Sequence, residues 1–172
     1  MHMNVKKKKE FKKWTISFII ILIIISVIGG GLYFYYSAPQ RVIKKYLKNR
    51  FIYSYSNIEN NLLKRNDLLS TEYIKETENN GVVENFLHEV RENQYTSQLG
   101  DYNIKFVDKT EHGYIYIVTA TSYIQDATNN VIKNNMTGFF TVKRYNLWTC
   151  LIINIESLSN DDSDHDHNSH NH

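Results

Sequence analysis

The sequence WTISFIIILIIISVIGGGLYFYY, residues 14–36, determines how the rest of the chain is organised. It has no charged side chain over 23 residues. A helix of this length spans about 34 Å, against about 30 Å for the hydrocarbon core of a bilayer. We therefore predict a transmembrane helix over residues 14–36. Aromatic side chains at both ends are its expected interfacial anchors: Trp14, Tyr33, Tyr35 and Tyr36.

The segment before this helix, residues 1–13, is strongly basic. Against one glutamate it carries six lysines: Lys6, Lys7, Lys8, Lys9, Lys12 and Lys13. Because basic flanks are retained in the cytoplasm, we expect residues 1–13 to form a cytoplasmic tail. The rest of the chain after residue 36 is then expected outside the cell membrane, with an extracellular C-terminus.

A cleaved signal peptide is the competing interpretation of the same N-terminal pattern, since it also places a basic region before an apolar one. The available cleavage site is poor. Tyr36 is bulky where a small residue is needed, and Pro39 follows the expected cut. We therefore favour an uncleaved signal anchor.

Composition narrows the classes of function. The 172 residues carry 20 Lys and Arg against 18 Asp and Glu, a net charge of +2. This near balance argues against a basic nucleic-acid-binding domain, so we expect no direct nucleic-acid partner. A single cysteine, Cys150, excludes an intramolecular disulfide and a cysteine-based zinc cluster.

Residues 37–160 are predicted to form one exported domain that begins with helices. Ser37 is a suitable N-cap and Pro39 suits a first turn, which predicts a new helix over residues 38–51. Its basic face is open to two interpretations, contact with lipid headgroups or simple solvation, and we favour solvation. The apolar positions that repeat at helical spacing are Val42, Ile43, Tyr46 and Leu47.

The pattern beyond this helix changes from helical to strand periodicity. Further helices are predicted over residues 58–63, 68–74 and 82–93, with a break at Asn66 and Asp67. Alternating and β-branched residues then predict strands over 103–107, 114–121, 137–143 and 148–155. Helices followed by a strand meander indicate an α+β domain, with about three helices packed on a curved, four-stranded antiparallel sheet.

This order of a lysine-rich tail, one span, helices and a curved sheet resembles the single-pass assembly factor of conjugative type IV secretion systems. The resemblance covers residues 1–158 and lies in architecture, so it assigns no individual functional residue. It implies a cone-shaped, nuclear-transport-factor-2-like exported domain, a non-enzymatic scaffolding role, a Gram-positive conjugative element, and other secretion-channel subunits as partners in the membrane. The resemblance also allows a homo-oligomer, but no heptad pattern in the sequence supports one.

Candidates for catalysis are few. His88 falls on a predicted helix, His112 in a predicted turn beside Glu111, and Cys150 on an apolar strand where we expect a small buried residue. No serine elbow, phosphate-binding glycine loop or HExxH motif is present. We therefore expect no catalytic residues and no enzyme. The alternative is a membrane-tethered ligand-binding or catalytic cone.

Tyrosines of the exported domain are candidate interface anchors, although some of them must also fill the core. They are Tyr53, Tyr55, Tyr102, Tyr114, Tyr116 and Tyr123.

The C-terminal segment, residues 161–172, contains four aspartates, four histidines and no basic residue. We expect it to be disordered, because charge repulsion and solvation oppose a packed structure. Imidazoles bind Zn or Ni, which makes surface metal capture a further alternative and weak binding at this tail the only cofactor expectation. The candidate ligands are His165, His167, His170 and His172.

Overall fold

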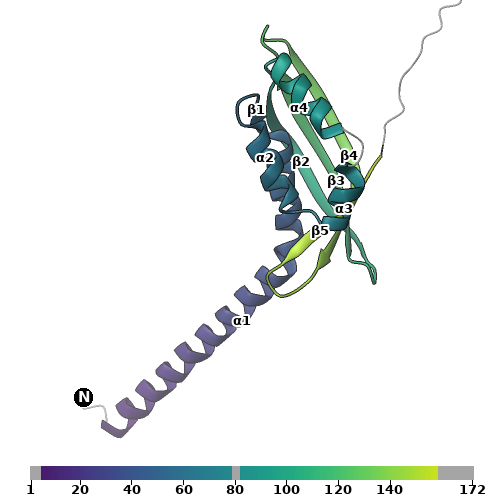
Figure 1. The fold of residues 1–172 in the computed structure, drawn as a ribbon. Helices are drawn as coiled ribbons and strands as arrows, with labels where there is room; N and C mark the ends of the chain where they lie inside the picture. Colours follow the sequence, from purple (N-terminus) through teal and green to yellow (C-terminus); the bar gives the residue numbers. More distant parts are fainter. Residues whose placement is uncertain (1–4, 79–81, 159–172) are drawn as a thin grey trace, which may run out of the picture. The chain divides into compact units, whose positions relative to one another are not determined.

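The computed structural model describes residues 5–78 and 82–158, with side chains for residues 14–77 and 83–158. The chain divides into two units, Met1–Ala38 and Pro39–His172. Helix α1, Val5–Phe51, begins in the first unit and ends in the second (Figure 1). Its apolar part is long enough to cross a membrane, a criterion that an N-terminal signal sequence also meets. The first unit is thus a membrane anchor or a signal sequence.

The predicted start of a new helix at residue 38 is wrong, because α1 has no break there. Ser37 does not cap a helix, since its hydroxyl donates a hydrogen bond to the Phe34 carbonyl at 3.5 Å. Pro39 lies inside the helix, where its missing N–H removes one helical hydrogen bond. Its ring is fully buried, and this burial offsets the loss.

The second unit starts with residues 39–51 of α1 and continues with three further helices. These are α2 (Ile58–Asn66), α3 (Thr71–Glu78) and α4 (Val82–Glu92). The predicted break after Asn66 is confirmed: the Asp67 N–H closes the last turn on the Leu63 carbonyl at 3.1 Å. The predicted helix over 82–93 is confirmed to within a residue at its end.

The sheet is antiparallel, and its spatial order follows the chain. Its strands are β1 (Tyr53–Ser54), β2 (Thr96–Lys109), β3 (Tyr114–Gln125), β4 (Val131–Arg144) and β5 (Cys150–Ser157). The α+β class is therefore confirmed, with five strands in place of four. The additional strand β1 has two residues, too few for any alternation, and it forms by pairing Tyr53 with Ser97 of β2.

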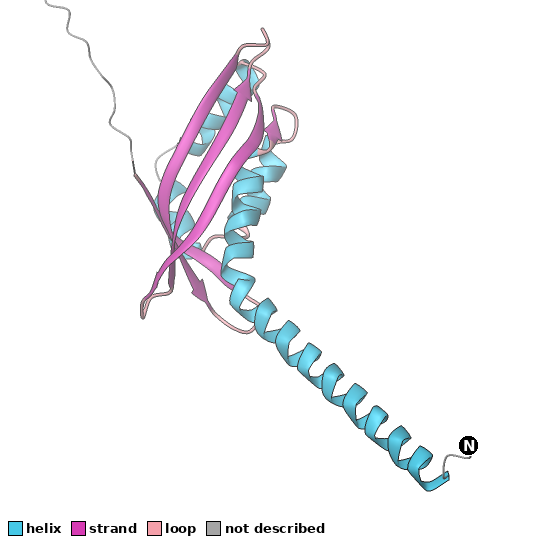
Figure 2. Cartoon of the chain, turned by 180° about the vertical axis from the view of Figure 1, so that it is seen from behind, coloured by secondary structure: helices cyan, strands magenta, loops and turns pink. Residues whose placement is uncertain are grey.

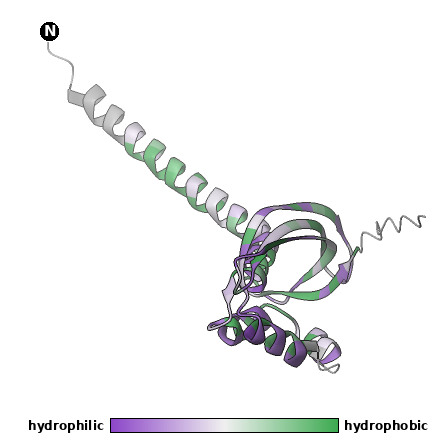
Figure 3. Ribbon diagram, turned by 90° about the horizontal axis from the view of Figure 1, so that it is seen from above, coloured by the Kyte–Doolittle hydropathy of each residue, from purple (hydrophilic) through white to green (hydrophobic). Residues whose placement is uncertain are grey.

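The sheet is strongly curved, as Figures 2 and 3 show for β2, β3 and β4. Register shifts interrupt the β2–β3 pairing twice and the β4–β5 pairing once. Such irregularities bend a strand and increase its twist. The outer edge of β5 is partly covered by the segment before α3. The Ile152 N–H donates a hydrogen bond to the Leu68 carbonyl at 2.9 Å, and the Ile152 carbonyl accepts one from the Ser70 N–H at 2.8 Å.

The core of the second unit lies between the concave face of the sheet and residues 43–51 of α1. Alternate residues of β3 are buried, as the period of a strand requires, beginning with Tyr116 and Val118. The ring of Tyr46 on α1 packs edge to face on Phe140 of β4, with centroids 5.6 Å apart. A second buried cluster joins α2 and α4 to β1 through Tyr53, Ile58, Leu62 and Val90.

Candidate functional site

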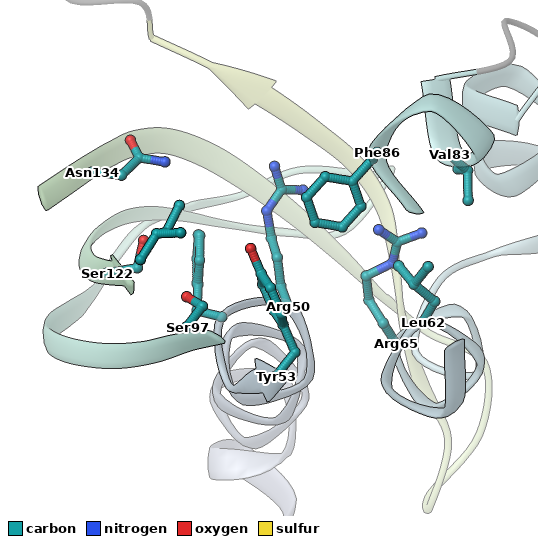
Figure 4. A pocket seen from close by; sticks show the side chains of 11 residues that line it. Arg50, Tyr53, Leu62, Arg65, Val83, Phe86, Ser97, Ser122 and Asn134 are labelled. Atoms are coloured by element: carbon teal, nitrogen blue, oxygen red, sulfur yellow. The ribbon is translucent and has the colours of Figure 1, made fainter. Parts of the chain in front are cut away.

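A cavity of about 260 Å³ lies within the second unit, between the sheet and the helices (Figure 4). Its walls come from the end of α1, from β1, α2 and α4, and from three strands of the sheet. The residues that line it are Arg50, Phe51, Tyr53, Leu62, Arg65, Val83, Phe86, Ser97, Ser122, Ile124 and Asn134.

Strand register brings the sheet residues of this cavity together. Ser97 of β2 pairs with Tyr53 on one side and with Ile124 of β3 on the other. Ser122 of β3 pairs with Asn134 of β4. Because Ser122 and Ile124 are two residues apart, they project from the same face of β3. These five side chains form two adjacent rows along one wall.

Arg50 supplies a permanent positive charge to the cavity. It is one helical turn after Tyr46 on α1, and its Nη1 donates a hydrogen bond to the Tyr46 hydroxyl at 2.9 Å. Its guanidinium carbon lies 5.6 Å from the centroid of the Phe51 ring. A second guanidinium, that of Arg65 on α2, donates from Nε and Nη2 to the Asn66 side chain. Figure 4 shows Arg50 and Tyr53 extending into the cavity.

The cavity has an unbalanced set of polar groups. None of its eleven lining residues, all of them within the described ranges, is Asp, Glu, His or Cys. Ser97 and Ser122 are 3% and 1% exposed. The Ser122 hydroxyl has no hydrogen-bond partner in the described part of the chain, and the Ser97 hydroxyl interacts only with the nearby Tyr53 hydroxyl. Burial raises the pKa of the Tyr53 hydroxyl, and the nearby Ser97 side chain opposes this only in part, so the hydroxyl stays protonated. The lining offers donors and positive charge without an anion.

The loop between β4 and β5, residues 145–149, is a second notable feature, which we call the aromatic loop. It exposes Tyr145 (51%), Leu147 (55%) and Trp148 (75%). The loop is well bonded, because the Asn146 side chain accepts the Trp148 and Thr149 N–H groups at 2.8 and 2.9 Å. A structured turn therefore presents apolar side chains outward.

The aromatic loop joins β5 next to the N-terminal end of the second unit. Cys150 directly follows the loop. Burial raises the pKa of its thiol, and the positive charges of Arg144 and Arg41 partly oppose this. Arg41 is only five residues beyond Tyr36, the last residue of the predicted span. Cys150, at the start of β5, is therefore within electrostatic range of Arg41.

The structure does not bring the candidate catalytic residues into the cavity. His88 is exposed on α4 and lies 3.4 Å from Glu92, and His112 is exposed in the β2–β3 turn, 3.4 Å from Glu111. Cys150 is 5% exposed, which confirms the expected small buried residue, and burial raises the pKa of its thiol. A thiol in this environment is a weak nucleophile.

The candidate interface tyrosines divide into two groups. Tyr53 and Tyr116 are core residues, whereas Tyr55 and Tyr123 are 45% and 43% exposed. Tyr102 and Tyr114 are half-buried. Only the two exposed tyrosines keep the surface expected of an anchor in a protein contact.

The remaining predicted site residues lie in or beside the first unit and the tail. Trp14, Tyr33 and Tyr36 are 80%, 75% and 69% exposed, and Tyr35 is half-buried. Lys6, Lys7, Lys8, Lys9, Lys12 and Lys13 belong to α1, but their side chains lie outside the described ones. The tail histidines, His165, His167, His170 and His172, are outside the described residues. Within those residues, no group of three His, Cys, Asp or Glu is placed to hold a metal ion.

Apart from Tyr53, which was expected as an interface anchor, the cavity residues belong to no motif in the sequence, although a signal for them exists. Arg50 follows Ile43 by seven residues and Tyr46 by four, which places it on the apolar face of the helix. Ser122 continues the alternate series of Tyr116 and Val118 on β3. A charge or hydroxyl on an apolar face is the signal that identifies these positions.

Comparisons with known protein families, with curated proteins and with solved structures give no match to the chain. The function of the chain is therefore inferred from its sequence, its fold and its cavity.

Proposed function

We propose that the protein is a single-pass membrane protein and a non-enzymatic assembly component of a bacterial conjugative type IV secretion channel. In this proposal the N-terminus is cytoplasmic, and the small α+β domain lies outside the cell membrane. The observation that carries the membrane part is the exposure of the apolar side chains over residues 14–34, which no described part of the chain covers. A bilayer supplies the missing apolar environment.

The orientation follows from charge. Six lysines precede the apolar segment of α1, within residues 1–13, and positively charged flanks are held on the cytoplasmic side. A reporter fused after His172 should be active only outside the cytoplasm. A cytoplasmic signal would contradict the orientation and with it the exported domain.

The aromatic loop supports a role in protein contacts. Tyr145 and Trp148 are residue types enriched in interfaces, and here they are exposed on a bonded turn. A domain tethered to a membrane has a raised effective concentration for its neighbours, so that a small contact surface suffices. The channel assignment itself rests on the architectural resemblance of the chain.

A crosslinking experiment in the native host tests the assembly role. A photoreactive residue replaces Trp148 in one chain and the exposed Lys133, on the distant part of β4, in a matched control. We expect adducts with other membrane proteins from position 148 and few from position 133. Deletion of residues 37–160 should abolish conjugation. Normal conjugation after this deletion would refute the assembly role, whatever the crosslinks show.

The cavity favours a second candidate function, a membrane-tethered ligand-binding domain. Its lining residues provide hydrogen-bond donors and cationic charge, and none of them titrates near neutral pH. Such a set binds a ligand and does not by itself transfer protons. The metal-capture alternative depends on residues 161–172 and is tested separately, by calorimetry of Zn binding to the chain with and without them.

A further inference from the structure

We propose that the Arg50 cavity binds a small carboxylate with an apolar body, such as an aromatic or branched-chain acid. The proposal develops the ligand-binding candidate. It does not depend on the secretion-channel assignment, so the conjugation experiment and the binding experiment below can fail independently.

Arg50 is an exposed residue at the cavity, and its guanidinium has donors that an anionic ligand can take. Ion pairs among the described residues join His88 to Glu92, Arg91 to Glu59 and His112 to Glu111, and none of them involves Arg50. Tyr46 takes one donor of a guanidinium that has five. A carboxylate matches the planar fork of the remaining donors and gains charge-assisted hydrogen bonds.

The two buried serine hydroxyls of the cavity can donate hydrogen bonds to an acceptor atom of the ligand. Buried polar groups are nearly always hydrogen-bonded, so a buried hydroxyl without a partner, such as that of Ser122, is unusual. Ser122 and Ser97 lie on neighbouring strands, on the face that lines the cavity. A carboxylate oxygen in the cavity accepts a hydrogen bond from either hydroxyl while its charge faces Arg50.

The opposite wall and the size of the cavity describe the rest of the ligand. Leu62, Val83 and Phe86 provide apolar surface from α2 and α4 (Figure 4). The volume of about 260 Å³ is near the lower end of small-molecule sites, which begin at about 300 Å³. The body of the ligand is therefore compact.

The available charge favours a carboxylate over a phosphate. Arg65 is also cationic, but it directs Nε and Nη2 to the Asn66 side chain, so more donors of Arg50 than of Arg65 are available to the head group of a ligand. A carboxylate matches the planar fork of the Arg50 guanidinium alone, whereas a phosphate dianion would need donors from both guanidinium groups.

Binding is measured on the full-length protein in lipid nanodiscs, by calorimetry and by saturation-transfer NMR. The probes are 3-phenylpropanoate and hexanoate, with 3-phenylpropan-1-ol and phenyl phosphate as matched controls for the charge and the head group. We expect saturable binding of at least one carboxylate, at least tenfold tighter than the alcohol or the phosphate.

Two variants locate the site. Arg50→Gln should weaken carboxylate binding about tenfold or more, whereas the same change at the exposed Arg91 should leave it unchanged. Ser122→Ala should weaken binding about threefold to tenfold. It should also leave the melting temperature of the unliganded protein equal or higher, because it removes a buried hydroxyl without a partner. This variant keeps the test valid if Arg50→Gln does not fold.

Three outcomes overturn the proposal. One is the absence of saturable binding for both carboxylates. Another is equal or tighter binding of the alcohol or of phenyl phosphate, which would refute the carboxylate class. The third is carboxylate binding that neither Ser122→Ala nor a folded Arg50→Gln weakens, since the ligand would then lie elsewhere.

Discussion

Replacing Phe140 with Ala should destabilise the second unit far more than the same change at Phe106. Both rings pack edge to face on a tyrosine with centroids 5.6 Å apart, Phe140 on Tyr46 and Phe106 on Tyr116, at interplanar angles of 73° and 70°. Their burial differs, since Phe140 is fully buried and Phe106 is 48% exposed. The pair therefore separates the effect of burial from that of ring geometry.

The magnitudes follow from these exposures. Phe→Ala at a fully buried site costs about 3–5 kcal/mol, because a cavity adds to the lost transfer free energy. Because Phe106 is about half exposed, its replacement loses only about half of the roughly 2 kcal/mol that full burial of the side chain would contribute. The aromatic contact adds about 0.5–1.5 kcal/mol there. The expected cost is thus about 1.5–2.5 kcal/mol for Phe106→Ala. At roughly 4 °C per kcal/mol, melting falls by about 12–20 °C for Phe140→Ala and about 6–10 °C for Phe106→Ala.

Thermal and urea unfolding of the full-length protein in a mild detergent, followed by near-ultraviolet circular dichroism of its tyrosines, measures both variants. The apolar helix has few of these tyrosines, so the signal reports mainly on the second unit. Equal losses of stability, or a larger loss for Phe106→Ala, would show that Phe140 is not a core residue and refute the packing of α1 on β4.

Three further predictions concern single positions. Gly138→Ala should cost about 1–3 kcal/mol, because its Cβ would lie 2.7 Å from a backbone carbonyl of β5, and urea unfolding measures this. Gly100→Ala should cost less, because its Cβ would meet an aromatic side chain that can move; the reverse order would be evidence against the β4–β5 pairing. Cys150 should react slowly with iodoacetamide at pH 8.5 and rapidly in urea, since burial raises its pKa and the thiolate forms first in the unfolded chain; equal rates would contradict its burial. The Thr128 hydroxyl, with backbone and side-chain donors from the same turn, lowers the pKa of Asp126. The ionised Asp126 carboxylate therefore stabilises the folded chain at pH values above the pKa that Asp126 has when unfolded. This stabilisation should be lost as the pH falls through the pKa of Asp126 in the folded chain. Asp126→Asn should therefore reduce the acid-dependent fall in melting temperature, and an unchanged pH profile would refute this assignment.

The existence of the helices and long strands could be predicted from sequence, because each depends on local periodicity, but their bounds could not. The helix expected over 68–74 is Thr71–Glu78, since Leu69 bridges to Ile152, and the strand expected over 103–107 is Thr96–Lys109. The alternation around Val118 and the spacing around Leu87 indicate a strand and a helix without reference to the rest of the chain. β1 was not predictable in this way, because two residues carry no period and Tyr53 joins the sheet only through a partner far along the chain.

The prediction that a new helix starts beside Pro39 was wrong for a related reason. Local preference places proline in a first turn and Ser37 at a cap, but the burial of Pro39 within the second unit stabilises a continuous helix. The candidate site could not be assembled from sequence, because Arg50, Ser97 and Ser122 meet only through strand register and the packing of α1. Each of them is visible in the sequence as a polar residue on an apolar face, but not as a neighbour of the others.

The chain-ordered sheet has a consequence for biogenesis. Under the proposed orientation, the second unit crosses the membrane as an unfolded chain, from residue 39 toward the C-terminus. Because β3, β4 and β5 each pair with the strand translocated just before them, the partner of each is already outside when it emerges. The sheet can grow one hairpin at a time upon the already exported end of α1, and the growing edge exposed to neighbouring chains is the one that the next strand covers.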